Sequence, residues 1–356
     1  MFMESSSLAI EAIEAVTKIG KPESFVALDT FMRPLRELLS EDVTELCVNK
    51  PGEAWLETAK GWERRDVRGL GYEHLKQIAN LAANASAQHI SEKSPLLSCA
   101  LPGGERMQVV TPPACSAGTV SLTIRRPSTC RFSLGDYDRA GFFDHVVVSR
   151  DGLRDYEVEL QAMLRERRLR AFFELAVAKR LTVLVSGATG SGKTTFMKAL
   201  VDAIPGAERL ITIEDTPELS LVNQPNHVRL FYSKGGQGVA KLSSADLVGA
   251  SMRMKPDRIL PAELRDEAAY AFLEAANTGH PGSISSIHAN TERAAVGRMV
   301  MLARKAPEAA AMSDTALREL VLDTIDVVVQ VGRAGTLRAI TGVYYDPERK
   351  AAIGHG

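Results

Sequence analysis

A glycine-rich loop between a strand and a helix constrains this sequence more than any other feature. Residues 187–195 read GATGSGKTT, which fits the pattern G-x-x-x-x-G-K-[ST] without a gap. An apolar, β-branched run at 181–186 precedes the loop, and a helix-forming run at 196–201 follows it. Glycines in such a unit let backbone N–H groups approach phosphates, and the helix N-terminus adds a positive dipole end. The pattern therefore predicts a phosphate-binding loop in an α/β domain.

The type of phosphate ligand follows from the side chains of the loop. Lys193 supplies a point charge for the outer phosphates of a nucleoside triphosphate, and the Thr194 hydroxyl is a magnesium ligand. We therefore expect ATP and Mg²⁺ as cofactors. The residues predicted to bind nucleotide here are Gly187, Ala188, Thr189, Gly190, Ser191, Gly192, Lys193, Thr194 and Thr195.

Composition excludes several classes of protein. The formal net charge of the 356 residues is −1, so no global basic field favours nucleic acid, and we expect no direct DNA binding. There is no apolar run of about 18 residues and no secretory signal at the N-terminus. None of the four cysteines (Cys47, Cys99, Cys115, Cys130) forms a C-x-x-C pair, which argues against zinc and favours reduced thiols. We expect a cytoplasmic protein.

The order of periodic segments predicts four regions. Residues 1–27 form an N-terminal extension, in which the apolar residues of 8–19 have helical spacing; the acidic polar face favours packing against a partner over lying on a membrane. Residues 28–128 read as an α+β domain with a glycine hairpin near 102–104, and 129–165 as a linker. Strands and helices then alternate through 166–350, as in a mainly parallel sheet that binds ligands at the carboxyl ends of its strands.

Three clusters after the loop are candidates for catalysis. The strand at 211–213 ends in Glu214 and Asp215, which either hold magnesium through water and orient the attacking water or form a solvated acidic turn. The strand at 258–262 ends in Glu263, in the form of a Walker B element, where it would polarise the attacking water; this carboxylate is a second possible magnesium contact through water. Pro261 is unexpected there, because proline cannot donate to a sheet ladder. Which of Glu214 and Glu263 is the general base stays open.

Histidine and arginine complete the candidate set. A small-residue strand at 283–287 leads to His288, which can hydrogen-bond a phosphate oxygen and report nucleotide state. Arg106, Arg125 and Arg253 can reach a bound triphosphate as fingers from another domain or subunit, although ordinary surface charge is the alternative for each.

In this order, the motifs resemble those of the secretion (traffic) ATPases. Residues 43–52 (VTELCVNKPG), 104–108 (GERMQ) and 123–128 (TIRRPS) resemble the VirB-type branch of type IV secretion, and the resemblance covers about residues 28–347. It implies a RecA-like C-terminal domain, an α+β N-terminal domain and a homohexameric ring with nucleotide between the domains. It also assigns Glu214 to the acidic box, Glu263 to Walker B and His288 to the histidine box. Arg106 and Arg125 match arginines of the first domain that face nucleotide, and Arg253 matches a phosphate contact.

The activity implied by the resemblance is Mg-dependent ATP hydrolysis that drives substrate translocation and pilus assembly. The implied partners are other inner-membrane components of the secretion system and the translocated substrate, with peripheral association at the inner membrane. Two alternatives keep the fold: a type II secretion or pilus-retraction ATPase, and a nucleotide-dependent assembly switch with little turnover. A DNA-translocating motor is disfavoured by the near-neutral charge.

Overall fold

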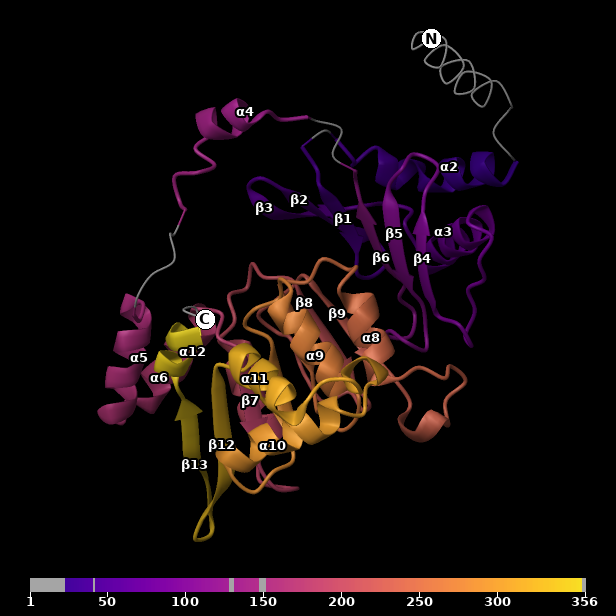
Figure 1. Ribbon diagram of the computed structural model, residues 1–356. Helices are drawn as coiled ribbons and strands as arrows, with labels where there is room; N and C mark the ends of the chain where they lie inside the picture. Colours follow the sequence, from indigo (N-terminus) through magenta and orange to yellow (C-terminus); the bar gives the residue numbers. More distant parts are fainter. Residues whose placement is uncertain (1–22, 41, 128–130, 147–151, 354–356) are drawn as a thin grey trace.

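The structure is a computed structural model that describes residues 23–40, 42–127, 131–146 and 152–353. The helix expected at 8–19 lies outside the described residues. The fold is mixed α/β, as predicted, and consists of an antiparallel sheet near the top of Figure 1 and a larger, mainly parallel part below it. No helix among the described residues is long and apolar enough to cross a membrane.

The first part is a six-stranded antiparallel sheet with two helices packed on it. Its strand order is β3-β2-β1-β6-β5-β4. Leu28 and Met32 of α2 pack with Leu75 and Ile78 of α3 in one buried core. The elements are α2 (Glu23–Arg36), β1 (Glu45–Val48), β2 (Glu53–Thr58), β3 (Gly61–Asp66), α3 (Tyr72–Ala85), β4 (Leu96–Ala100), β5 (Arg106–Val110) and β6 (Ser121–Arg125).

A connecting segment and two helices follow. The segment contains α4 (Leu134–Arg139), which has no buried residue and lies apart from both sheets in Figure 1. Helix α5 (Asp155–Arg165) lies within the range expected as linker, and its Leu160 and Met163 are buried against α6 (Leu169–Ala178) in the core of the second part. The helical conformation is interrupted between α5 and α6 at Arg167, which adopts φ 58°.

The second part has seven strands in two groups. One group has the order β10-β8-β9 and is parallel; the other has the order β11-β7-β12-β13 and is parallel except for β13. The strands are β7 (Val183–Ser186), β8 (Leu210–Glu214), β9 (His227–Phe231), β10 (Arg258–Pro261), β11 (Ile284–Ile287), β12 (Val327–Ala334) and β13 (Leu337–Tyr345). The helices are α7 (Lys193–Asp202), α8 (Ser244–Ser251), α9 (Ala268–Asn277), α10 (Glu292–Ala303), α11 (Asp314–Thr324) and α12 (Pro347–Ile353), with short 3₁₀ turns at Lys234–Gly236 and Pro307–Ala309.

Serine hydroxyls join the two groups where β10 and β11 lie side by side. Ser285 Oγ donates to the Pro261 carbonyl at 2.7 Å, and the Ile259 N–H donates to Ser283 Oγ at 3.1 Å. The Ala262 N–H faces the other way, toward the Ile213 carbonyl of β8. The nitrogen of Pro261 therefore points at this seam, where no regular ladder needs a donor, which explains how proline fits the strand.

The two parts share a buried interface. Loop residues Ala114 and Cys115 of the first part pack with Leu230 of β9, and the Phe231 N–H donates to the Ala114 carbonyl at 2.9 Å. Deeper in, Arg209 is fully buried and donates to Asn49 Oδ1 at 2.7 Å across the interface. This contact fixes the antiparallel sheet to the first residues of β8.

Candidate nucleotide site

The glycine loop has the backbone geometry that its sequence predicts. It leaves β7 at Ser186 and enters α7 at Lys193. Gly190 and Gly192 have φ of 72° and 103°, a region that favours glycine. A Cβ atom on Gly187 would collide with the carbonyl oxygen of Val331 on β12. Glycine at these positions therefore lets the loop turn tightly against the neighbouring strand and directs backbone groups outward.

Lys193 is held inside this loop by two neighbours. Its side chain is largely buried, and Nζ donates to the Ala188 carbonyl at 3.0 Å. His288 Nδ1 lies 3.2 Å from the same nitrogen. An ammonium only donates, so Nδ1 is the acceptor and the neutral imidazole carries its proton on Nε2. Burial lowers the pKa of Lys193, with the positive charge of Arg265 acting in the same direction.

Glu263 links His288 to an arginine. Its Oε1 lies 3.1 Å from His288 Nε2, the nitrogen that carries the proton. Arg265 clamps the carboxylate with two hydrogen bonds, from Nε to Oε1 and from Nη2 to Oε2 (2.7 Å). Burial favours a higher pKa for Glu263, but the hydrogen bonds and charge of Arg265, together with the charge of Lys193, outweigh it and lower the pKa. Glu263 is therefore held ionised.

The acidic cluster after β8 divides into two roles. Asp215 accepts a hydrogen bond from Arg265 Nη1 at 3.0 Å, so it belongs to the same network as Glu263. Glu214 is fully buried, and its oxygens accept from the Thr212 hydroxyl, from the Arg229 guanidinium and from the N–H groups of Glu218 and Leu219. The contacts of Glu214 order the turn that follows the strand.

The three candidate catalytic side chains lie at the carboxyl ends of three strands. Lys193, Glu263 and His288 follow the last residues of β7, β10 and β11, which are adjacent parallel strands. The carboxyl ends of such strands form the ligand-binding edge of an α/β sheet. A neighbouring cavity of about 870 Å³ is lined by Ala188, Thr189, His288 and residues of α10.

The three expected arginine fingers lie elsewhere in the chain. Arg106, Arg125 and Arg253, all exposed, line one cavity of about 570 Å³ with Lys255. Arg253 and Lys255 precede β10, whereas Glu263 follows it. This cavity is therefore at the amino end of the strand, opposite the glycine loop, and a single chain does not bring these arginines to Lys193. Two other histidines have structural contacts: His280 Nδ1 lies 3.0 Å from the Pro256 carbonyl, and His227 Nδ1 lies 2.6 Å from the Gln224 carbonyl.

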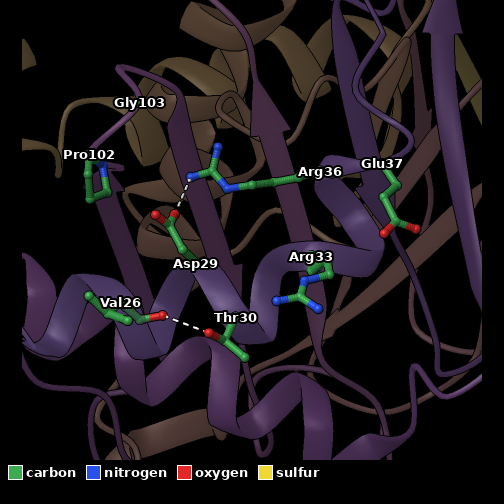
Figure 2. Close-up of a pocket in the computed structure, with 8 residues that line it drawn as sticks. All are labelled: Val26, Asp29, Thr30, Arg33, Arg36, Glu37, Pro102 and Gly103. Atoms are coloured by element: carbon green, nitrogen blue, oxygen red, sulfur yellow. Dashed lines mark hydrogen bonds and ion pairs between the residues drawn. The ribbon is translucent and has the colours of Figure 1, made fainter.

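A further cavity, of about 770 Å³, lies on the first part between α2 and the turn after β4 (Figure 2). Arg36 forms ion pairs there with Asp29 at 3.0 Å and with Glu105 at 2.8 Å, and the Thr30 hydroxyl donates to the Val26 carbonyl. These contacts hold α2 to the turn. None of these contacts involves a residue of the glycine loop.

The donor set suits magnesium that arrives with phosphate. Thr194 is in the first turn of α7, where a hydroxyl can coordinate a metal, and Glu263 supplies one carboxylate nearby. In the described part of the chain, no group of three or more His, Cys, Asp and Glu residues is arranged to hold a metal by itself. Mg²⁺ in nucleotide sites commonly takes one or two protein ligands, with phosphates and water filling the rest.

Arg265 is the member of this network that the sequence motifs did not identify, whereas Asp215 was expected in the acidic cluster with Glu214. Arg265 lies two residues after Glu263. The available signal was the spacing: residues two apart after a strand end can hydrogen-bond directly, as Arg265 and Glu263 do.

A protein-family model, two relatives and one solved structure each match most of this chain. The family model described as type II/IV secretion system protein matches residues 30–330. The type IV secretion system protein VirB11 of Brucella suis is 43% identical over 328 residues, covering 90% of this chain and 91% of the relative. The type IV secretion system protein PtlH of Bordetella pertussis is 38% identical over 334 residues, covering 91% and 96%. The crystal structure of the B. suis VirB11 ATPase in complex with sulphate matches with a TM-score of 0.89 at 42% identity, covering 94% of this chain and 98% of that one.

Proposed function

The chain belongs to the type II/IV secretion system protein family and to its VirB11 branch of type IV secretion ATPases, and from that membership we propose that it hydrolyses ATP to energise a type IV secretion system. The observation that carries the proposal is the contact chain from Lys193 through His288 to Glu263 at the mouth of the glycine loop. The sulphate named for the B. suis structure, a tetrahedral anion, supports a phosphate site in the family.

Each member of the contact chain has one task in the proposed reaction. Lys193 leaves the Ala188 carbonyl and contacts the outer phosphates, since a buried ammonium gains more from phosphate than from a neutral carbonyl. Glu263, held ionised by Arg265, accepts the proton of the attacking water. His288 lies between them and couples phosphate occupancy to the position of Glu263. Thr194 and, through water, Glu263 would hold magnesium, which would supply positive charge beside the phosphates.

Glu263 is the better candidate for the general base, and Glu214 the better candidate for a support. All the donors around Glu214 come from the protein itself, so using it as a base breaks contacts that shape the turn. Glu214 then acts only indirectly, by holding the segment after β8 through the N–H groups of Glu218 and Leu219.

The remaining arginines fit a ring of several copies. Arg106 and Arg125 are directly opposite each other on β5 and β6, and with Arg253 they form an open basic cavity remote from their own glycine loop. Like charges in register are costly unless an anion lies between them. The Glu45 carboxyl lies 3.5 Å from Arg125 in this cavity, but Arg106 and Arg253 have no ion pair among the described residues. A nucleotide presented by a neighbouring copy would supply that anion, which supports a homohexamer in which each site is shared between subunits.

The finer assignments follow the family. We assign residues 28–128 to an N-terminal domain and 166–350 to a RecA-like domain, with 129–165 between them and α5 already packed on the second. The proposed partners are other inner-membrane components and the translocated substrate, with peripheral association at the inner membrane and a role in pilus assembly. The identity to VirB11 and PtlH favours type IV secretion over a type II or pilus-retraction machine.

The test is ATP turnover by purified protein. Lys193→Ala is expected to lose both nucleotide binding and turnover. Glu263→Gln is expected to keep binding and lose turnover by about 10²–10⁴-fold, the usual contribution of a general base. Arg68→Gln, which changes an exposed arginine in the turn after β3, is the matched control and should behave as wild type. Secretion that survives Glu263→Gln unchanged would identify the chain as a nucleotide switch instead of a hydrolase.

A further inference from the structure

The hairpin of β12 and β13 passes beside the glycine loop. Pairing between β12 and β7 ends at Gln330 and Ser186, the last residue of β7. Strand β12 continues to Ala334 and returns as β13, so the hairpin extends beyond the carboxyl edge of the sheet, at the bottom of Figure 1. The end of the hairpin is therefore on the same side of the sheet as Lys193.

One arginine of this hairpin lies against the loop itself. A Cβ placed on Gly192 would be 3.2 Å from Cδ of Arg338 and 3.8 Å from its Nε. Gly192 is the residue directly before Lys193, at the N-terminus of α7. The guanidinium of Arg338 is thus a second cation beside a site built for an anion, and it comes from a strand that none of the recognised motifs includes.

A second arginine faces Arg338 across the hairpin. Arg333 on β12 and Arg338 on β13 are partners in the antiparallel register. Both are exposed, and neither has a hydrogen bond or ion pair with any residue that the structure describes. Like charges directly opposite on paired strands destabilise a sheet, whereas an anion between them reverses the sign. Their position beside the glycine loop supplies such an anion when nucleotide binds.

The order of the strands decides which end of the nucleotide Arg333 and Arg338 contact. Strand β7 lies between β11 and β12. Glu263 and His288 are on the β11 side, where the proposed hydrolysis of the γ-phosphate occurs. The α-phosphate and nucleoside then leave the loop on the other side, toward β12. The geometry points to Arg338 as a nucleotide-binding residue that contacts the α-phosphate, with Arg333 strengthening the positive potential beside it.

This inference rests on the proposed function, because it requires nucleotide in the glycine loop. The experiment measures the affinity of the full chain for Mg-ADP by calorimetry, and the affinity for pyrophosphate by competition with ADP. Pyrophosphate fills the outer phosphate positions but has no α-phosphate attached to a nucleoside. The variants are Arg338→Gln, Lys193→Ala and the control Arg68→Gln.

Arg338→Gln is expected to weaken ADP by about tenfold, the effect of one charge-assisted hydrogen bond at an exposed site, and to leave pyrophosphate nearly unchanged. Lys193→Ala is expected to weaken both ligands. Without nucleotide, Arg338→Gln should unfold at the same or a higher temperature than wild type, because it relieves the Arg333 repulsion; a merely structural arginine would lower it.

The outcomes separate the two proposals. If wild type binds no nucleotide, the proposed function fails. If Lys193→Ala abolishes ADP binding while Arg338→Gln binds ADP like wild type, the proposed function stands and the role of Arg338 is overturned. Equal losses for ADP and pyrophosphate in Arg338→Gln would also overturn its placement at the α-phosphate.

Discussion

Replacing Glu45 with glutamine should make the protein more stable at alkaline pH. Glu45 begins β1, and its carboxyl is almost entirely buried, with Oε2 lacking a hydrogen-bond partner among the described groups. Arg125 Nε is 3.5 Å from Oε1, too far for a strong contact and largely in solvent. Burial raises the pKa of Glu45 from 4.5 to about 7, against the opposing charges of Arg125, Lys255 and Arg209 and with that of Glu57.

The sign and size of the effect follow from proton linkage. Between pH 4.5 and about 7, the folded chain holds a proton on Glu45 that the unfolded chain has released. Folding stability therefore falls as the pH rises through this window and stays low above it. At about 1.4 kcal/mol per pH unit, the gap gives a loss of up to about 3 kcal/mol, and partial screening by the open arginine cavity reduces it to about 1–3 kcal/mol.

The assay is thermal unfolding at pH 5.5, 7 and 8.5, followed by tryptophan fluorescence. Both tryptophans, Trp55 and Trp62, lie on β2 and β3 of the antiparallel sheet that contains Glu45. Glu45→Gln should differ least from wild type at pH 5.5, where only part of the linkage loss has occurred, and unfold about 3 °C or more above it at pH 8.5, from the usual 2–4 °C per kcal/mol. Glu92→Gln, which changes an exposed carboxylate between α3 and β4, is the control and should follow wild type at each pH. Parallel pH curves for wild type and Glu45→Gln would refute the argument.

Three further predictions concern the interface, the seam and the catalytic network. Asn49→Ala removes one acceptor of fully buried Arg209, which keeps the Met254 carbonyl and Asn226 Oδ1, and also removes the 2.9 Å bond from Asn49 Nδ2 to Asn226 Oδ1. The change should cost about 1–3 kcal/mol, measured by urea unfolding with tryptophan fluorescence; unchanged stability would contradict it. Ser285→Ala removes the hydroxyl bond to the Pro261 carbonyl and should cost about 1 kcal/mol in the same assay. Ser116→Ala should not, because Ser116 lies on a half-buried loop and its hydroxyl has no hydrogen bond with any residue that the structure describes. Arg265→Gln removes the largest pKa-lowering contact of Glu263, so the acid limb of the pH–rate profile should move to higher pH; an unmoved limb would exclude the clamp.

Sequence periodicity predicted most of the fold because the elements are strongly patterned and well punctuated. The strand expected at 181–186 is β7, and the strand expected at 283–287 is β11. Helix α3 ends at Ala85, just before Ala87 adopts φ 53°, a backbone state that side-chain periodicity does not encode. Strand β13 runs antiparallel to β12. A pattern of alternating strands and helices does not predict this direction.

The candidate site was predictable where one motif encodes one local geometry. The glycine loop needs only its own residues and their φ values, so the nine-residue pattern was sufficient. Arg265 and Arg338 depend on contacts between strands, and no local pattern states that Arg338 returns to lie beside Gly192. The same limit applies to Arg106 and Arg125, whose register on β5 and β6 is a tertiary fact. Their remoteness from Lys193 follows from how the two parts are joined.

Pro261 and the serines of β11 are best understood as one feature. A proline in a central strand loses a ladder bond unless its nitrogen faces a neighbour that offers no carbonyl in register. Ser285 instead donates to the Pro261 carbonyl from its side chain, Ser286 donates to the Ala262 carbonyl, and Ser283 accepts the Ile259 N–H. One backbone bond also crosses the seam beyond Pro261, from the Leu264 N–H to the Ser286 carbonyl. This seam passes between Glu263 and His288, which follow the two strands. Hydrogen bonds of this kind contribute about 1 kcal/mol each, so the relative position of Glu263 and His288 depends on three serine hydroxyl bonds and on the backbone bond from the Leu264 N–H to the Ser286 carbonyl.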